Sequence, residues 1–126
     1  MQTALYLAAL LCFLVGVAHS YLGERFILAR LLGSDEFPKI FRNPDFIKAT
    51  IRFAWHLTTL AWWGFAVLIV LIARGPGSFN AGNAGLLIGS MFLLNFAVAL
   101  IASRGKHLAW ILFLAIGVLV IWATRV

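Results

Sequence analysis

The sequence predicts an all-α membrane protein, an antiparallel four-helix transmembrane bundle with both termini on the non-cytoplasmic side. Three observations predict this fold. The chain is 63% hydrophobic and only 11% charged, whereas soluble domains are about 45–50% apolar and about 25% charged. Its apolar residues gather in four long stretches, and its basic residues gather between them. A chain of 126 residues cannot bury so much apolar surface in a globule, so a lipid bilayer must act as its solvent.

The four spans are expected within one domain, residues 1–126, at about residues 3–28, 51–73, 84–103 and 108–124. Stretches of roughly 17–25 apolar residues are long enough to cross about 30 Å of hydrocarbon, because a helix rises about 1.5 Å per residue. Polar and apolar residues do not alternate through these stretches, which argues against membrane strands.

Basic side chains predict the orientation. Eight of them flank or occupy the first and third connections: Arg25, Arg30, Lys39, Arg42, Lys48, Arg52, Arg104 and Lys106. The opposite side holds only Arg74 and Arg125. Because short basic loops stay in the cytoplasm, both termini should face away from it, and the expected location is a bacterial inner membrane. The same bias explains the net charge of +6 without nucleic acid, for which no binding motif is present.

The connections predict how the spans are joined. The first, at about residues 32–48, is the only long one, and its aromatic residues alternate with basic residues. That composition is typical of a partly helical segment at the headgroup level. Asn43-Pro44-Asp45 is a turn and helix-start signal. The other two connections are short, which favours antiparallel neighbours.

Three histidines, each on a different span and near its basic end, form the candidate site: His19, His56 and His107. Glu24 and Arg52 lie in the same layer. Ionisable side chains are costly inside a membrane, so a layer of them is a functional-site hypothesis.

Helical spacing suggests where these side chains point. His19 shares a stripe with small residues, which lets another helix approach and predicts that His19 points into the bundle. Glu24 lies about 140° from His19 around an ideal helix, so the two cannot face one point. On the second span, Arg52, His56 and Thr59 form one polar stripe. We therefore expect His19 and His56 to face each other, with His107 nearer the surface and with support from Ser20, Glu24, Arg52 and Thr59.

Three functions fit this layer of residues. In the first, His19 and His56, with His107, bind a transition metal (Zn, Cu or Fe) or haem b, for which imidazole is a common ligand. In the second, the layer is the proton-linked site of a small transporter or channel, which would need an oligomer because four spans are few. In the third, the histidines only hydrogen-bond neighbouring helices, and the protein is a structural or assembly partner of another membrane protein.

An enzyme is a weaker hypothesis. The sequence contains no nucleophile elbow and no glycine-rich phosphate loop. A lipid-modifying enzyme with His19 or His56 as base remains an alternative, because its substrate would lie at the same membrane depth.

Two strings carry a resemblance. "HSYLGER" (His19 to Arg25) and "RFAWHLTTLAWWG" (Arg52 to Gly64) resemble a group of small uncharacterised four-span inner-membrane proteins of proteobacteria. The resemblance covers the first two spans. It implies a bacterial inner membrane and implies no particular activity.

Overall fold

The computed structural model describes residues 2–34 and 43–125, and these residues form helices with no strand among them. The first rod is continuous and consists of α1 (Gln2–Leu22), a wide π-turn η1 (Gly23–Leu28) and α2 (Ala29–Gly33). It is followed by α3 (Pro44–Arg74), α4 (Ala81–Ser103) and α5 (Ala109–Ala123). The all-α prediction is confirmed.

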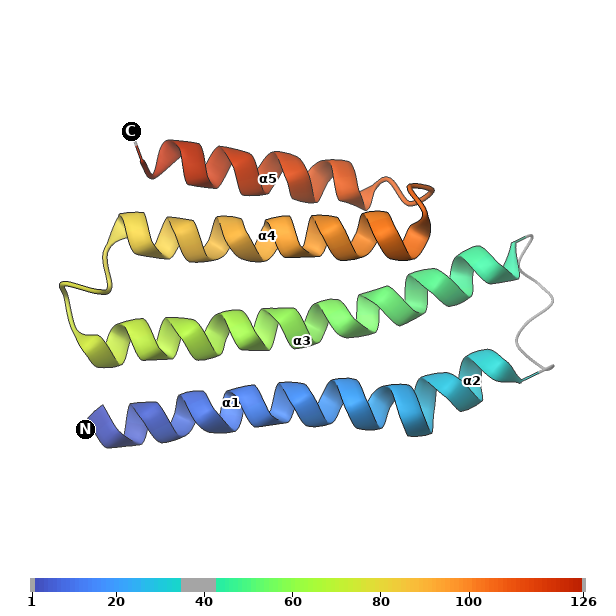
Figure 1. Cartoon of the computed structure of the whole chain (residues 1–126), viewed down its shortest axis with the longest axis horizontal. Coiled ribbons are helices and arrows are strands. Elements are labelled where there is room, and N and C mark those ends of the chain that lie inside the picture. The colour runs from blue at the N-terminus through green and yellow to red at the C-terminus, as the bar shows by residue number, and fades with distance from the viewer. Residues whose placement is uncertain (1, 35–42, 126) are drawn as a thin grey trace.

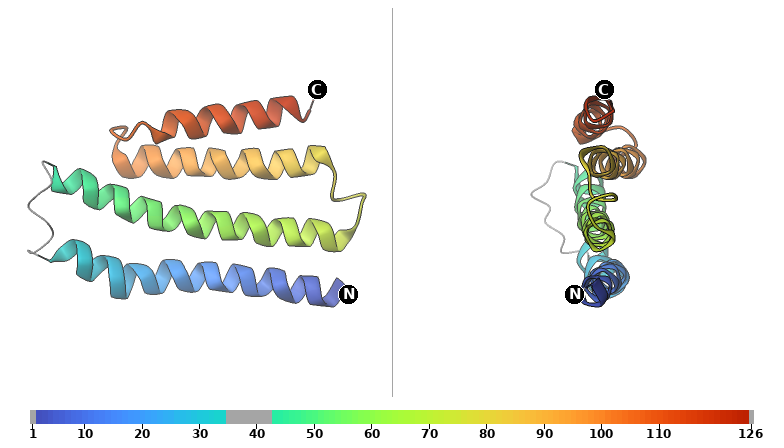
Figure 2. Two further views of the ribbon diagram at one scale, coloured as in Figure 1. Left: turned by 180° about the vertical axis from the view of Figure 1, so that it is seen from behind. Right: turned by 90° about the vertical axis from the view of Figure 1, so that its left-hand side faces the viewer.

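The helices lie side by side in one row rather than around a common interior (Figures 1 and 2). α1 packs on α3, α3 on α4, and α4 on α5. The end-on view of Figure 2 shows α1 and α5 at the two edges of this row. The chain reverses at each connection, and both termini lie at the same end (Figure 1). A polar side chain therefore sits either in a seam between two neighbouring helices or on an open face.

Three of the rods are long and apolar enough to cross a membrane: residues 2–33, 44–74 and 81–103, with mean hydropathies of 1.9, 1.9 and 2.2. α5 is apolar but has only 15 residues, which corresponds to about 22 Å of helix against about 30 Å of hydrocarbon. By length and composition the described residues thus contain three candidate spans, and the fourth span stays a prediction.

Helices extend into both ends of the expected long connection. The first rod continues to Gly33, and α3 begins at Pro44, seven residues before the expected start at 51. The side chain of Asn43 accepts a hydrogen bond from the backbone N–H of Phe46 at 3.2 Å, so the predicted helix-start signal is confirmed. The middle of the expected headgroup-level segment, residues 35–42, lies outside the described residues.

Small residues allow close packing in two seams. In the α1–α3 seam, a β-carbon added at Gly16 or Gly23 would collide with the indole of Trp63 or Trp55, respectively. In the α4–α5 seam, Gly89 on α4 faces Gly117 on α5. Helices in a bilayer associate largely through such close approach. The small residues expected beside His19 are therefore where the tryptophans of α3 dock.

Candidate functional site

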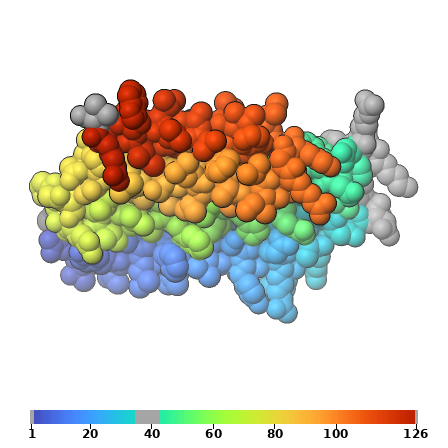
Figure 3. All heavy atoms as spheres, turned by 45° about the horizontal axis from the view of Figure 1, so that its top comes forward, coloured from blue at the N-terminus to red at the C-terminus, as the bar shows by residue number. Residues whose placement is uncertain are grey.

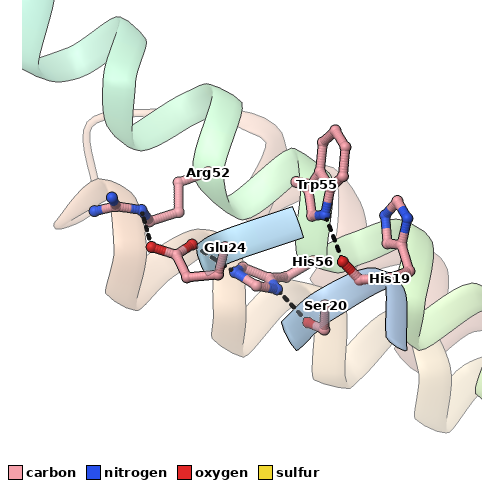
Figure 4. Close-up of polar contacts among 6 residues, drawn as sticks. All are labelled: His19, Ser20, Glu24, Arg52, Trp55 and His56. Atoms are coloured by element: carbon pink, nitrogen blue, oxygen red, sulfur yellow. Dashed lines mark hydrogen bonds and ion pairs between the residues drawn. The ribbon is translucent and has the colours of Figure 1, made fainter. Parts of the chain in front are cut away.

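Four polar side chains meet in the seam between the first rod and α3 (Figure 4). Nδ1 of His56 lies 2.5 Å from Oγ of Ser20, and Nε2 of His56 lies 3.4 Å from one carboxylate oxygen of Glu24. The other oxygen of that carboxylate lies 3.1 Å from Nε of Arg52. We call Ser20, His56, Glu24 and Arg52 the Glu24 network.

Helical spacing explains why these residues meet. Ser20 on α1 and Glu24 on η1 are four residues apart, as are Arg52 and His56 on α3. Residues four apart lie one above the other on the same face of a helix. Two such pairs face each other across the seam. Glu24 lies in the π-turn, a rare irregularity that is common at functional sites.

The network accommodates two protonation states of His56 with the same heavy-atom positions. A neutral imidazole can donate from Nε2 to Glu24 and accept at Nδ1 from the hydroxyl of Ser20. A charged imidazolium donates from both nitrogens, and the Ser20 oxygen then accepts. Arg52 holds the Glu24 carboxylate in both cases. The geometry therefore suits a site that gains and loses one proton.

Exposure limits how much the network stabilises the fold. The side chains of His56, Glu24 and Arg52 are 33%, 39% and 50% exposed, respectively. Polar contacts between transmembrane helices average about 0.6 kcal/mol, so the network should stabilise the seam only modestly. The indoles of Trp55 and Trp63 pack in the same seam. Stability alone is therefore a weak reason for placing these ionisable groups here.

His19 contacts a different set of residues. Its ring stacks on the indole of Trp55, with centroids 4.4 Å apart and planes 3° apart. The ring of Trp62 meets it edge-on at 4.8 Å. Nε2 of His19 is buried and has no hydrogen-bond partner among residues 2–34 and 43–125. Because successive residues on a helix are about 100° apart, Ser20 rather than His19 contacts His56, and the expected His19–His56 pair is replaced by two separate environments.

His107 lies at a third place, in the turn before α5. Its ring stacks on Phe46 with centroids 5.8 Å apart and meets Phe53 edge-on at 5.3 Å. Its Nδ1 accepts a hydrogen bond from the backbone N–H of Ala109 at 3.2 Å. His107 thus packs against the first turns of α3. Its ring contacts and hydrogen bonds with the described residues include no member of the Glu24 network.

Thr59 and Cys12 occupy the seam as packing residues. Thr59 is 3% exposed, and its hydroxyl oxygen has no hydrogen-bond partner. The thiol of Cys12 donates to the backbone carbonyl of Trp62 at 3.1 Å. Thr59 therefore lies on the expected polar stripe of α3. Its hydroxyl makes no hydrogen bond with the described residues of the Glu24 network.

The described part of the chain gathers no cluster of metal-ligating side chains around these histidines. Within residues 2–34 and 43–125, no three His, Cys, Asp or Glu side chains form a group that could hold a metal ion. His19 packs between tryptophans, and both ring nitrogens of His56 are engaged by Ser20 and Glu24. A shared ligand would require at least one of these rings to leave its partners.

Sequence reasoning named all four members of the Glu24 network but did not join His56 to Glu24. The signal that could have found it is the spacing of four residues within each pair. It also missed the aromatic box that Trp55 and Trp62 build around His19. In comparisons with known proteins, no family model, curated protein or solved structure matches this chain.

Proposed function

We propose that this protein is a proton-linked transporter or channel of the bacterial inner membrane, that it acts as an oligomer, and that its proton site is the Glu24 network. One observation supports this most strongly. The two oxygens of the Glu24 carboxylate are divided between the fixed cation Arg52 and the titratable ring of His56. Glu24 is also the only acidic residue in the expected spans. Intramembrane carboxylate–histidine pairs are typical proton relays.

The charges around His56 define what one proton changes. With neutral His56, the Arg52 cation and the Glu24 carboxylate balance each other. A proton on His56 gives the network one net positive charge. On the first rod, Glu24 and Ser20 contact the His56 ring. The guanidinium of the nearby Arg25 donates a hydrogen bond to the hydroxyl of Tyr21 at 3.1 Å. Imidazole is the side chain best suited to gain and lose a proton under physiological conditions, so the network contains a group suited to proton transfer.

The response would act on the seam between the first rod and α3. The contacts of His56 with Ser20 and Glu24 and of Arg52 with Glu24 cross that seam, so a change in charge alters the attraction between the two helices. A ligand or proton shifts a conformational equilibrium only through different interactions in the two states. The proton would therefore shift the equilibrium between a closed and a loosened seam at the basic end of the spans.

Orientation and assembly belong to the same proposal. We infer an antiparallel four-helix transmembrane bundle in which the basic end, with the network, faces the cytoplasm and both termini face outward. The support is the eight-to-two distribution of basic residues. Four helices in a row surround no common interior (Figure 2). A pathway across the membrane would therefore be formed between copies.

The first test is proton flux through the purified protein in vesicles. A pH-sensitive dye trapped inside would report proton entry driven by an imposed membrane potential. We expect flux with the unmodified protein and the background rate of protein-free vesicles with Glu24→Gln or His56→Gln. The matched control is His107→Gln, which changes a histidine outside the network and should retain the flux. Equal flux in all variants, or none in the unmodified protein, would reject the proposal.

The second test observes the proton site directly. Nuclear magnetic resonance of isotope-labelled imidazoles is practical because the chain has three histidines. Glu24→Gln should change the chemical shifts of the His56 imidazole nitrogens, because it replaces the carboxylate that faces Nε2, and it should leave the shifts of His107 unchanged. Imidazole shifts of His56 that do not respond to Glu24→Gln would contradict the network. Loss of stability in Glu24→Gln without any flux in the unmodified protein would favour the structural or assembly role.

Binding of a metal ion (Zn, Cu or Fe) or haem b is the second hypothesis. The observation that favours it is the buried Nε2 of His19, which has no partner. Metal analysis and an absorption spectrum of protein purified in mild detergent would test it. Stoichiometric metal or a Soret band that is lost in both His19→Phe and His56→Gln would support this hypothesis in place of the proton site.

A further inference from the structure

A second group of charged residues lies where the start of α3 meets the turn between α4 and α5. A pocket of about 400 Å³ opens there. Asp45 lines it from α3, and Arg104 and Lys106 line it from the turn. Figure 3 shows the start of α3 (turquoise) beside the end of α4 (orange). The Glu24 network contributes no residue to this pocket.

The pocket presents charges of both signs that are available to a ligand. Asp45, Arg104 and Lys106 take part in none of the ion pairs that the structure shows between described residues, which both belong to the Glu24 network. All three side chains are exposed. Apolar groups of Phe46, Ala49 and Ala102 line the same pocket. A matching ligand therefore carries an anion, a cation and an apolar portion.

Several uncharged polar groups at the pocket are already hydrogen-bonded to described residues. The N–H of Phe46, at the start of α3, donates to the side chain of Asn43. The hydroxyl of Ser103 donates to the carbonyl of Ala99 at 2.6 Å and accepts from the N–H of His107 at 3.3 Å. The three charged side chains are the strongest groups at the pocket for binding a charged ligand.

The backbone holds Arg104 at the pocket in an unusual conformation. Arg104 ends α4 with φ 51° and ψ 40°, in the left-handed region that normally favours glycine. The turn is fixed by hydrogen bonds from the N–H of Gly105 to the carbonyl of Leu100 and from the indole of Trp110 to the carbonyl of Gly105. Tryptophan is enriched at the membrane–water interface. A tryptophan at this turn therefore supports a position at headgroup depth for the pocket.

We propose that this pocket binds a phospholipid whose headgroup carries both a phosphate and an ammonium group, as phosphatidylethanolamine does. Arg104 and Lys106 bind the phosphate through charge-assisted hydrogen bonds. Asp45 binds the ammonium. The apolar wall of the pocket that contains Phe46 contacts the glycerol and the first acyl carbons. A lipid with a phosphate but no ammonium would leave the Asp45 carboxylate unpaired beside the phosphate. The bound lipid would tie the start of α3 to the α4–α5 turn.

The test is thermal unfolding of the full-length protein in detergent, with and without an added probe. The probes are short-chain phosphatidylethanolamine, short-chain phosphatidylglycerol and inorganic phosphate. We expect phosphatidylethanolamine to raise the unfolding temperature most and inorganic phosphate to have little effect. Asp45→Asn should weaken phosphatidylethanolamine binding by about threefold to fivefold, the range expected for a partly exposed ion pair, and should not weaken binding of phosphatidylglycerol.

Two further variants keep the test decisive. Arg104→Gly removes the guanidinium and suits the left-handed backbone, so it should fold while losing the lipid-dependent shift. The matched control is Arg74→Gln, which removes an exposed arginine at the other end of α3 and should retain the shift. An equal shift from inorganic phosphate would identify a soluble anion site and overturn the lipid proposal. An equal shift from phosphatidylglycerol, insensitive to Asp45→Asn, would overturn the ammonium site.

Discussion

His19 and Trp55 are joined by two independent contacts. Their rings stack with centroids 4.4 Å apart, and the indole N–H of Trp55 donates to the backbone carbonyl of His19 at 3.1 Å. The second contact uses the backbone, so it does not depend on which side chain stands at position 19. The first contact leaves Nε2 of His19 buried without a partner. In this arrangement the ring of His19 packs α1 against α3, and its Nε2 makes no hydrogen bond with the described residues.

Substitutions at His19 therefore distinguish a packing role of its ring from a binding role of its nitrogen atoms. His19→Phe keeps a flat ring against Trp55 and removes the unpartnered nitrogen, so the free energy of unfolding should stay within about 1 kcal/mol of the original value or rise. His19→Ala removes the stacked ring and should lower it by about 2 kcal/mol. Denaturant unfolding in detergent measures both. If His19→Phe were as damaging as His19→Ala, the imidazole nitrogens would have to bind a ligand or partner.

Gly23 is the position where the first rod is most sensitive to added volume. A methyl group there would collide with the indole of Trp55, so Gly23→Ala should lower the free energy of unfolding by about 1–3 kcal/mol. Gly33→Ala is the matched control, because a β-carbon at Gly33 meets no atom within 4 Å. The control should be neutral or slightly stabilising. Equal effects of the two substitutions would show that the indole does not occupy the seam.

The Glu24–Arg52 ion pair should give a small coupling energy. A double-mutant cycle with Glu24→Gln and Arg52→Gln should yield about 0.2–1 kcal/mol, because both side chains are partly exposed. The coupling should weaken as salt is added. A parallel cycle with Glu24→Gln and Arg74→Gln should give no coupling energy, since Arg74 lies at the C-terminal end of α3, away from Glu24. A coupling energy of zero for Glu24 and Arg52 would remove Arg52 from the network.

Labelling of single cysteines tests the orientation. In a Cys12→Ala background, a membrane-impermeant thiol reagent applied from outside should label Ser78→Cys and miss Ser34→Cys and Lys106→Cys. The physical reason is the retention of basic connections in the cytoplasm. Labelling of all three after the membrane is permeabilised is the control. The reverse pattern in intact cells would move the Glu24 network to the outer face of the membrane.

Several features could be predicted from the sequence because they depend on local composition. The apolar content requires a bilayer or an equivalent solvent, and the long apolar stretches form helices because a backbone in hydrocarbon must satisfy its hydrogen bonds internally. Asn43 caps α3 as its sequence context predicts. The residues of the Glu24 network were identifiable as well, since ionisable side chains are rare and costly in such stretches.

Pairing and arrangement were decided only in the tertiary structure. Helices that are apolar all round carry no amphipathic stripe to show which side meets a neighbour, so a row and a closed bundle are compatible with the same sequence pattern. The contacts of Ser20 rather than His19 with His56 depend on a rotation of one residue, about 100°, between helices that the tryptophans of α3 fix against Gly16 and Gly23. The sequence determined which polar groups the membrane segments contain. The packing of bulky indoles against glycines decided which of those groups meet.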